Sequence, residues 1–304
     1  VLVENIERFG ARNVVVTNES ADRLSQVFHG YFDLIVLDAP CSGEGMFRKQ
    51  PEAMEYWNES YPTQCAQVQR EILENTVKML ATNGELIYST CTWSPEENEQ
   101  IVDWLLENYP LELVEIPKIN GMIAGINFPE TARMYPHHFK GEGQFVAKFR
   151  LCSKQSAKKL KVKKSHLTSE QKMLWQKFQR EHLAIDLTGE LQTFGDHLYL
   201  LPLGLPDLSK LKIARNGLYL GVFKKKRFEP SFALGLALKP SEVKHIIEID
   251  EEQFKKYVAG ETVNLNQNPE NGWYQVVVQG NGLGFAKVTG NILKNYFPKG
   301  LRFQ

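Results

Sequence analysis

The sequence contains few cysteines, and they are not spaced as pairs. Four cysteines occur among 304 residues, and no two of them are close in the chain. This spacing argues against the disulfide framework of small secreted domains, and no C-x-x-C pattern indicates a zinc site. We therefore expect no metal centre, and we expect the protein to work in the reducing cytoplasm.

Two kinds of apolar segment are also missing. The first residues, Val1 to Asn5, lack the basic and then apolar order of a signal peptide. No uninterrupted apolar run approaches the ~18 residues that a membrane span requires. The sequence thus predicts a soluble protein without a membrane partner, which we expect to be a monomer of two domains or three small ones.

A glycine-rich turn is missing where a nucleotide-like cofactor would need it. Residues 3–9 resemble the end of an amphipathic helix stopped by Gly10, and residues 14–17 are typical of a strand. The turn that cradles such a cofactor follows the first strand of the domain, and none precedes Val14. We therefore expect the first βαβ unit to be absent, and about 100–150 residues to precede Val1 in the natural protein.

The chain has no net charge, but its two halves carry charges of opposite sign. Residues 1–150 hold 12 Lys and Arg against 22 Asp and Glu, whereas residues 151–304 hold 24 against 14. A basic half joined to an acidic one predicts that the second half meets a polyanion such as nucleic acid. A lysine-rich solvated surface is the alternative.

The first half alternates strands with helices. Strands are expected at residues 32–37 and 84–88, helices at residues 64–81 and 96–108, and a hairpin-like pair near residues 144–149. This alternation predicts a doubly wound α/β domain, and the two apolar runs are typical of buried parallel strands.

The sequence of the second half predicts smaller domains. A hairpin is expected at residues 273–278 and 284–288, joined through Asn281-Gly282. The expected organisation is a partial catalytic domain (1–152), a basic linker (153–168), a small α+β domain (169–229) and a β-rich domain (230–304).

Cys41 and Cys91 each follow one of the two predicted parallel strands. Cys41 lies in Asp-Ala-Pro-Cys-Ser-Gly-Glu-Gly, which begins at Asp38, and Cys91 lies in Ser-Thr-Cys-Thr-Trp-Ser-Pro-Glu-Glu-Asn-Glu, which begins at Ser89. Open α/β sheets bind ligands at the carboxyl ends of their strands, so both thiols and the Asp38 carboxylate can meet in one crevice. A buried structural cysteine is the alternative, and it suits Cys65 and Cys152 better.

Two thiols and a carboxylate suit attack on an electrophilic carbon of a base. A thiolate that adds to carbon 6 of cytosine makes carbon 5 electron-rich enough to accept a methyl group. A carboxylic acid at the ring nitrogen and amine stabilises the charge that develops. A second thiol is a plausible participant in release.

The two cysteine motifs resemble those of the Sun-type RNA cytosine-5 methyltransferases. The resemblance extends to Arg48-Lys49, to the segment 133–138, and to residues 141–147. The segment 284–298 resembles the end of the bacterial ribosomal-RNA methyltransferase F branch. The resemblance implies a Rossmann-like methyltransferase domain, here incomplete, followed by a small α+β domain and a PUA-like β-barrel.

The resemblance also implies roles for individual residues. Cys91 would attack carbon 6, Cys41 would assist release, and Asp38 would hold the cytosine edge. The cofactor would be S-adenosylmethionine, with Glu19 at its adenine and Asp38 and Pro40 beside it. The partner would be RNA, specifically 16S ribosomal RNA or the small ribosomal subunit. RNA contacts are expected from a larger set of basic residues: Arg48, Lys49, His137, Lys224, Lys225, Lys226 and Lys287.

Other functions remain open on the sequence alone. With half of the cofactor site missing, the chain could be a non-catalytic RNA-binding fragment, and we expect it to be inactive by itself. Amino-group methyltransferases use an Asn/Asp-Pro-Pro-aromatic strand end, which is not found at Asp38 to Cys41. A thiol hydrolase would need a histidine, and none lies near either cysteine in the sequence.

Overall fold

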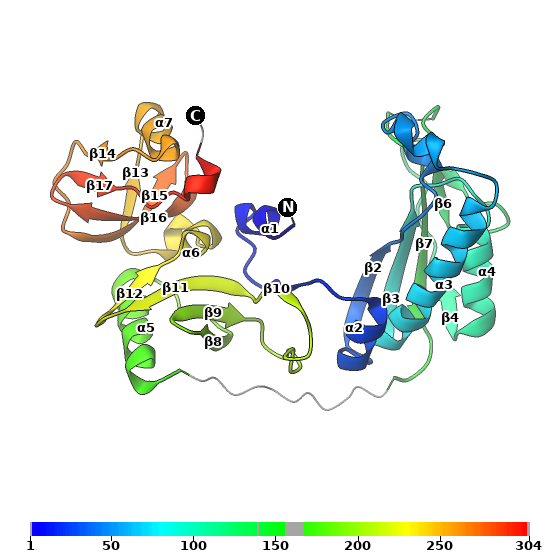
Figure 1. The fold of residues 1–304 in the computed structure, drawn as a ribbon, viewed down its shortest axis with the longest axis horizontal. Helices are drawn as coiled ribbons and strands as arrows, with labels where there is room; N and C mark the ends of the chain where they lie inside the picture. Colours follow the sequence, from blue (N-terminus) through cyan, green and yellow to red (C-terminus); the bar gives the residue numbers. More distant parts are fainter. Residues whose placement is uncertain (1, 139, 156–166, 303–304) are drawn as a thin grey trace. The chain divides into compact units, whose positions relative to one another are not determined.

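The computed structural model describes residues 2–138, 140–155 and 167–302. The chain divides into two compact units (Figure 1), one formed by Glu19–Lys159 and the other by Val1–Asn18 with Leu160–Gln304. In the described residues, no helix combines the length and the apolar character needed to cross a membrane. Most of the predicted basic linker lies outside the described residues.

The unit Glu19–Lys159 is built on a mixed sheet with the strand order β2-β3-β7-β6-β5, in which β4 also pairs with β7. β2 and β3 are parallel, whereas β7 is antiparallel to β3, β4 and β6. The strands are β2 (Phe32–Asp38), β3 (Leu80–Thr90), β4 (Leu111–Leu113), β5 (Ile123–Ala124), β6 (Ala132–Met134) and β7 (Gln144–Leu151). The two strands expected before the cysteines are therefore parallel neighbours, and their carboxyl ends share one edge.

Helices of this unit cover one face of the sheet. They are α2 (Ala21–Val27), α3 (Tyr61–Met79) and α4 (Glu99–Asn108). Leu73 of α3 and Ile101 of α4 pack with Leu86 of β3 and Phe149 of β7 in one core, and all four side chains are fully buried. The alternation of β3 and β7 residues thus directs every second side chain toward the helices.

The other face of β2 is open, which differs from the buried strand that the sequence predicts. Leu34 and Val36 are 51% and 64% exposed, whereas Ile35 and Leu37 pack against the core. Within the described residues β2 pairs with β3 on one side and forms the edge of the sheet on the other. The run is apolar on both faces, but the described chain covers one of them.

The segment expected to be the first strand of this domain lies in the other unit. Of residues 14–17, Val16–Thr17 form β1, which pairs with β10 (Ile213–Arg215). Helix α1 (Leu2–Arg8) precedes it, and Arg12 forms an ion pair with Glu242. The strand is short enough that its apolar pattern could not reveal its partner.

A four-stranded antiparallel sheet with the order β12-β11-β9-β8 forms the first part of the second unit. Its strands and helix are β8 (Glu190–Phe194), β9 (His197–Leu201), β11 (Leu218–Lys224), β12 (Arg227–Pro230) and α5 (Ser169–His182). The hydroxyl of Thr168 caps α5 by accepting from the backbone N–H of Gln171. Trp175 and Phe178 of α5 pack in the core that contains Leu198 of β9.

A five-stranded sheet with the order β13-β15-β16-β17-β14 forms the rest of this unit. Its elements are α6 (Phe232–Ala237), β13 (Ile246–Glu248), α7 (Glu251–Ala259), β14 (Val263–Asn264), β15 (Gly272–Val278), β16 (Asn281–Thr289) and β17 (Ile292–Lys294). Short 3-10 helices lie at Glu44–Met46, Pro51–Glu55, Pro240–Glu242 and Lys299–Leu301.

The predicted hairpin of this sheet is confirmed, but its turn is not where the sequence placed it. The turn residues are Gln279 and Gly280, with φ angles of 47° and 76°, and Asn281 already belongs to β16. A two-residue turn of this type requires positive φ at both positions. Val278 pairs with Asn281, so the turn lies two residues before the Asn-Gly pair that the sequence favoured.

Candidate active site

Cys41 and Cys91 lie side by side beyond the carboxyl ends of β2 and β3. Asp38, the last residue of β2, is opposite Ser89 of β3, and the cysteines follow in the adjoining loops. Their Sγ atoms are 3.0 Å apart, and the backbone N–H of Cys91 donates to the Sγ of Cys41 at 3.3 Å. The structure thus brings together the two thiols that the sequence singled out.

A buried carboxylate, that of Glu97, holds the loop that follows β2. Its Oε2 accepts from the backbone N–H of Ser42 at 3.0 Å and from Nε2 of Gln69 at 2.7 Å. The Gln69 amide also donates to the carbonyl of Pro40 at 2.9 Å and accepts from the hydroxyl of Tyr88 at 2.9 Å. Burial raises the pKa of Glu97. The loop is therefore attached to α3 and β3 through side chains without solvent access.

Glu44 connects the two cysteine loops. Its Oε2 accepts from the hydroxyl of Thr92 at 3.1 Å and from the backbone N–H of Trp93 at 3.3 Å. The hydroxyls of Thr92 and Ser42 are 2.9 Å apart, which adds a direct link between the loops. These contacts fix the relative position of the two loops and therefore of the thiols they carry.

Gly45 occupies a position where the backbone of three segments converges. Its N–H donates to the carbonyl of Cys91 at 2.9 Å, and its carbonyl accepts from the N–H of Gly143 at 3.1 Å. A Cβ at Gly45 would lie 2.5 Å from the carbonyl oxygen of Gly143 and 2.8 Å from that of Cys91. No side chain fits there without moving the loop of the second thiol.

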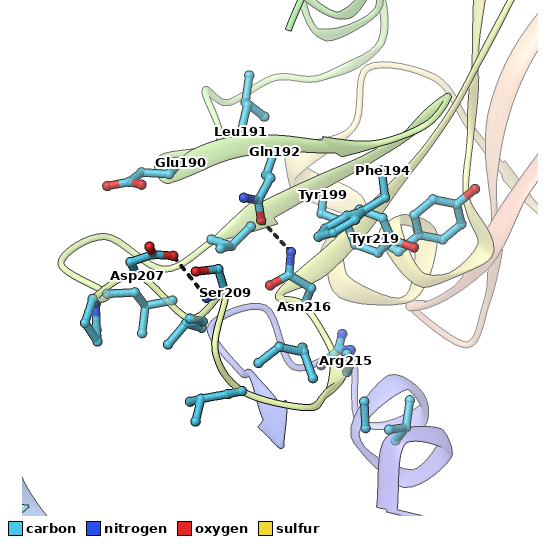
Figure 2. Close-up of a pocket in the computed structure, with 18 of the residues that line it drawn as sticks. Glu190, Leu191, Gln192, Phe194, Tyr199, Asp207, Ser209, Arg215, Asn216 and Tyr219 are labelled. Carbon is cyan, nitrogen blue, oxygen red and sulfur yellow. Dashed lines mark hydrogen bonds between the residues drawn. The ribbon is translucent and has the colours of Figure 1, made fainter. Parts of the chain in front are cut away.

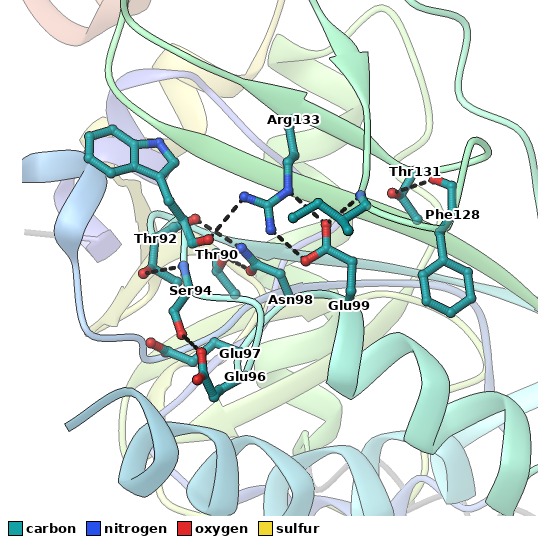
Figure 3. Close-up of polar contacts among 12 residues, drawn as sticks. Thr90, Thr92, Ser94, Glu96, Glu97, Asn98, Glu99, Phe128, Thr131 and Arg133 are labelled. Carbon is teal, nitrogen blue, oxygen red and sulfur yellow. Dashed lines mark hydrogen bonds and ion pairs between the residues drawn. The ribbon is translucent and has the colours of Figure 1, made fainter. Parts of the chain in front are cut away.

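Asn98 supports the Cys91 loop from the α4 side (Figure 3). Its Nδ2 donates to the carbonyl of Thr92 at 3.0 Å, and its Oδ1 accepts from the hydroxyl of Thr90 at 2.6 Å. All three side chains are fully buried. The last residue of β3 and the loop after it are thereby held to the residue that precedes α4.

Arg133 and Glu99 form a buried two-bond ion pair beside the same loop (Figure 3). Arg133 donates from Nε to Oε1 of Glu99 at 2.7 Å and from Nη2 to Oε2 at 2.5 Å. Its Nη1 donates to the carbonyl of Trp93 at 3.0 Å. A bidentate pair with a further backbone acceptor satisfies the charges inside the protein and fixes the backbone two residues after Cys91.

The two thiols have opposite electrostatic environments. The hydrogen bond from the Cys41 thiol lowers the pKa of Cys91, and the same interaction raises the pKa of Cys41. Burial acts against the charged form of both, and the Asp38 carboxylate further opposes a thiolate at Cys91. The two directions favour Cys91 over Cys41 as the thiol that ionises first, and the thiolate is the nucleophilic form.

The residues predicted on the cofactor side are divided between two places. Asp38 and Pro40 are exposed at the edge of the sheet next to the thiols. Glu19 instead precedes α2, where it forms an ion pair with Nε of Arg23 at 3.1 Å. The strand end therefore places two of the three residues beside the cysteines.

The residues of this unit that were predicted to touch RNA are exposed. Arg48 forms an ion pair with Glu142 at 3.0 Å, and Lys49 lies next to it in the chain. His137 stacks on Tyr135 with a ring separation of 5.4 Å, and the Tyr135 ring is 6.2 Å from that of Trp93. His137 is thus connected to the Cys91 loop through aromatic rings.

The remaining predicted RNA contacts belong to the other unit. Lys224, Lys225 and Lys226 are exposed at the β11–β12 turn. Lys287 is exposed on β16, opposite Trp273 of β15. The lysines at residues 158–164 lie outside the described residues.

The sequence reasoning missed the buried polar residues that support the thiols: Gln69, Glu97, Asn98, Glu99 and Arg133. Two signals could have found them. Gln69 lies at helical spacing from buried Cys65 and Leu73, so a polar side chain interrupts the apolar face of α3. Glu97 and Glu99 lie in the polar segment between a predicted buried strand and the helix after it, where a buried carboxylate would be costly unless it accepted hydrogen bonds.

Family comparisons cover most of the chain. The family described as 16S rRNA methyltransferase RsmB/F matches residues 1–150. The RsmF rRNA methyltransferase first C-terminal domain matches residues 177–238, and the methyltransferase RsmF PUA domain matches residues 244–303. These matches confirm the expected succession of a methyltransferase domain, a small α+β domain and a PUA domain.

Curated relatives match along nearly the whole chain. Ribosomal RNA small subunit methyltransferase F of Shewanella loihica is 32% identical over 315 residues, which cover 99% of this chain and 64% of the relative. The protein of the same name from Cronobacter sakazakii is 31% identical, with 99% and 65% covered. The chain therefore spans a little under two thirds of the length of these relatives.

Solved structures match up to about half of the chain. NSun6 from Pyrococcus horikoshii with SFG is 34% identical over 50% of this chain and 38% of its own, with a TM-score of 0.45. A methyltransferase homologue from Pyrococcus horikoshii is 31% identical over 49% and 48%, with a TM-score of 0.40. On the family matches and the curated relatives, the chain belongs to the RsmB/F family of rRNA methyltransferases, in the branch of the small subunit methyltransferase F.

Proposed function

We propose that the protein is part of an S-adenosylmethionine-dependent RNA cytosine-5 methyltransferase in which Cys91 is the nucleophile. The observation that carries the proposal is the pair of thiols 3.0 Å apart beyond two parallel strands, with the pKa of Cys91 lowered. The names of the relatives support small-subunit ribosomal RNA, which is 16S RNA in bacteria, as the substrate.

Each thiol has a distinct task in the proposed reaction. The Cys91 thiolate adds to carbon 6 of cytosine, and the electron pair displaced from the C5–C6 bond makes carbon 5 nucleophilic. After carbon 5 has been methylated, its proton passes to water in the half-exposed crevice and Cys91 is expelled as a thiolate. The thiol of Cys41, whose Sγ lies 3.0 Å from that of Cys91, stabilises the leaving thiolate by donating a hydrogen bond to it. Asp38 holds the base edge in this proposal.

The residues at the end of β2 fit one side of the proposed cofactor. Asp38 and Pro40 are exposed beside the thiols and could hold S-adenosylmethionine there. When bound, the cofactor supplies an electrophilic methyl carbon. Glu19 forms an ion pair with Arg23, so a contact between Glu19 and the adenine would require a local rearrangement.

The open face of β2 supports the proposal that further chain completes the site. Leu34 and Val36 are exposed on an edge strand, where an additional strand and helix would cover them. We therefore propose that the residues described here lack the amino-terminal part of the cofactor site and are inactive alone. The same observation favours the second candidate function, a non-catalytic RNA-binding fragment.

The proposed organisation follows the sequence-based boundaries: a catalytic part at 1–152, a basic linker at 153–168, an RNA-binding α+β domain at 169–229 and a PUA-like RNA-binding domain at 230–304. The matched ranges 177–238 and 244–303 support this division. Arg48, Lys49, His137, Lys224 to Lys226 and Lys287 remain the proposed RNA contacts, and a monomer remains the proposed state.

Denaturing gels test the division of labour between the thiols. In the full-length enzyme, Cys41→Ala should accumulate a covalent complex with substrate RNA, because Cys91 still attacks but is not released efficiently. Cys91→Ala should form no complex and no 5-methylcytosine. A complex that persists in the double variant Cys41→Ala/Cys91→Ala contradicts the assignment.

A further inference from the structure

The outer face of the sheet β8-β9-β11 carries aromatic side chains where a solvated face is expected. The inner face packs Leu198 and Leu220 in the core. On the outer face the ladder places Tyr199 opposite both Gln192 and Tyr219. An antiparallel sheet with one buried face normally presents polar residues on the other. Tyr219 also packs against the core, whereas Phe194 is exposed, so packing within the unit explains only part of this row of rings.

The rings form a connected and accessible group. The Tyr199 and Tyr219 rings are 5.0 Å apart and tilted by 34°, and the Phe194 ring lies edge-on to that of Tyr199 at 5.7 Å. The hydroxyl of Tyr219 is 2.7 Å from Nδ1 of His197, which holds the Tyr219 ring in place. Phe194 is 53% exposed. We call Phe194, Tyr199 and Tyr219 the aromatic platform.

The platform borders a cavity of about 550 Å³ in the same unit (Figure 2). Inside it, Nδ2 of Asn216 donates to Oε1 of Gln192 at 2.7 Å, so the two carboxamides orient each other. Oriented carboxamides next to aromatic rings can read the edge of a planar, polar ring that stacks on the platform. The size is that of a small-ligand site.

Arg215 lines this cavity, and two of its hydrogen-bond donors, which are buried behind the cavity surface, have no partner in the described residues. It is 6% exposed and lines the cavity, and its Nη2 donates to the carbonyl of Ala11 at 3.1 Å. Its Nε and Nη1 are buried and make no hydrogen bond within the part of the chain that the structure describes. A buried donor without an acceptor is costly, so these two groups indicate a ligand with acceptor atoms.

The charged residues that line the cavity determine which part of a nucleic acid can enter it. Glu7, Glu190 and Asp207 also line the cavity. Three carboxylates around one guanidinium repel a phosphate, whereas the ring nitrogen and carbonyl oxygen acceptors of a base can meet Arg215, and base amino groups can meet the carboxylates. The backbone would then stay outside the cavity, in a half of the chain with 24 Lys and Arg against 14 Asp and Glu.

We propose that this cavity and the aromatic platform bind an unstacked base of single-stranded RNA, at a position separate from the cysteine site. The inference rests on the proposed function in one respect, since it takes RNA as the substrate. The base stacks on Tyr199 and Phe194, and its edge meets Arg215, Gln192 and Asn216.

Fluorescence anisotropy with the complete 304-residue chain tests the platform. The probe is a fluorescein-labelled single-stranded RNA of mixed sequence, with a duplex of the same sequence as comparison. Tyr199→Leu and Phe194→Leu should each weaken single-strand binding by about 5- to 100-fold, the range expected for losing one stacked base. Duplex binding should change less than twofold, because paired bases are already stacked.

A matched variant controls for folding and for general loss of apolar surface. Met173→Leu replaces an exposed apolar residue of α5 in the same unit and should leave binding unchanged. If Tyr199→Leu lowers the unfolding midpoint, the binding test relies on Phe194→Leu, because the Phe194 side chain is half exposed. Ultraviolet crosslinking of RNA to the unmodified chain provides a second measurement. Crosslinked nucleotide should map to Phe194, Tyr199 or Tyr219.

Unchanged single-strand affinity in both platform variants, equal losses for single-strand and duplex RNA, or crosslinks elsewhere overturn the inference. These outcomes are separate from those of the cysteine test. An enzyme that forms no covalent complex with RNA but shows platform-dependent binding would refute the cytosine-5 chemistry alone. A covalent complex combined with platform-independent binding would refute the platform alone.

Discussion

Cys41 and Cys91 have the same side chain, yet their pKa values shift in opposite directions. The hydrogen bond between the two thiols lowers the pKa of Cys91 and raises that of Cys41. The sequence predicted that both thiols would share one crevice, but it did not determine which would ionise more readily. The difference depends on a contact between residues 50 positions apart, which no local pattern encodes.

Alkylation kinetics should show this difference. At about pH 7, iodoacetamide should modify Cys91 faster than Cys41 or the buried Cys65, because the thiolate is the reactive form. Cys41→Ala removes the donor, so the pKa of Cys91 should rise and its thiolate fraction at this pH should fall. Peptide mapping by mass spectrometry would follow each cysteine separately, including exposed Cys152. The control Cys65→Ala should leave the Cys91 rate unchanged, and a Cys91 rate that increases in Cys41→Ala contradicts the assignment.

Glu97 should matter for stability through the donors it satisfies. Glu97→Ala leaves the N–H of Ser42 and the amide of Gln69 without this acceptor and should reduce the free energy of unfolding by about 2 kcal/mol or more. Glu97→Gln keeps one acceptor oxygen and should cost less. Urea denaturation of both variants measures the difference, and equal losses would show that the carboxylate oxygen is not what holds the loop.

The same residue gives a pH dependence with a definite sign. Because burial raises the pKa of Glu97 in the folded protein, the folded state binds more protons than the unfolded state between the two pKa values. The contribution of Glu97 to the free energy of unfolding therefore falls as pH rises through that window, from about pH 4.3 upward. Glu97→Gln should remove this component, which a series of urea denaturations across pH would detect. If the free energy of unfolding fell more steeply with pH in the variant than in the parent chain, the prediction would be contradicted.

At the scale of elements, the strands and helices near the thiols follow from the sequence, whereas their environment does not. The apolar runs at 32–37 and 84–88 predicted β2 and β3 and their parallel pairing. They did not predict the exposed face of β2, because a run that is apolar on both sides looks the same whether or not a neighbour covers it. The hairpin turn at Gln279-Gly280 was missed because Asn-Gly is the stronger turn signal in the sequence, whereas the strand pairing places Val278 opposite Asn281.

Alanine substitutions on β2 and β3 should report the difference between the two faces. Leu34→Ala should cost about 1 kcal/mol or less because its side chain is half exposed. Leu86→Ala, on the neighbouring strand and fully buried, should cost about 2–5 kcal/mol. Urea denaturation of the 304-residue chain measures both. A Leu34 variant as destabilised as the Leu86 variant would mean that the open face is covered in solution.

At the scale of the whole molecule, sequence composition predicted the charge division between the two halves. The apolar pattern of residues 14–17 did not reveal that β1 pairs with β10, since a two-residue ladder has too little pattern to identify a partner. The cluster of buried polar residues around Glu97 and Arg133 could not be predicted from the sequence either, because its members come from α3, β6 and the residues around the start of α4. The basic half predicts how RNA binding depends on salt.

RNA affinity of the chain should fall steeply as salt rises. If six to ten phosphates are contacted, binding to a mixed-sequence RNA should weaken by on the order of a thousandfold or more between 50 and 200 mM salt. Replacing Lys224, Lys225 and Lys226 by Gln should reduce the slope of log affinity against log salt. The exposed pair Lys255 and Lys256, which already form ion pairs within α7, provides the matched control. Salt-independent binding would mean that the basic half is a solvated surface.

The covalent bond between enzyme and RNA is the most direct measure of the central claim, which is that Cys91 attacks the base. Full-length Cys41→Ala enzyme would be incubated with substrate RNA, digested with nuclease and protease, and mapped by mass spectrometry. The account predicts a cytidine nucleotide attached to the peptide that contains Cys91. A nucleotide on the peptide of Cys65 or Cys152, or an enzyme that methylates RNA after Cys91→Ala, would contradict it.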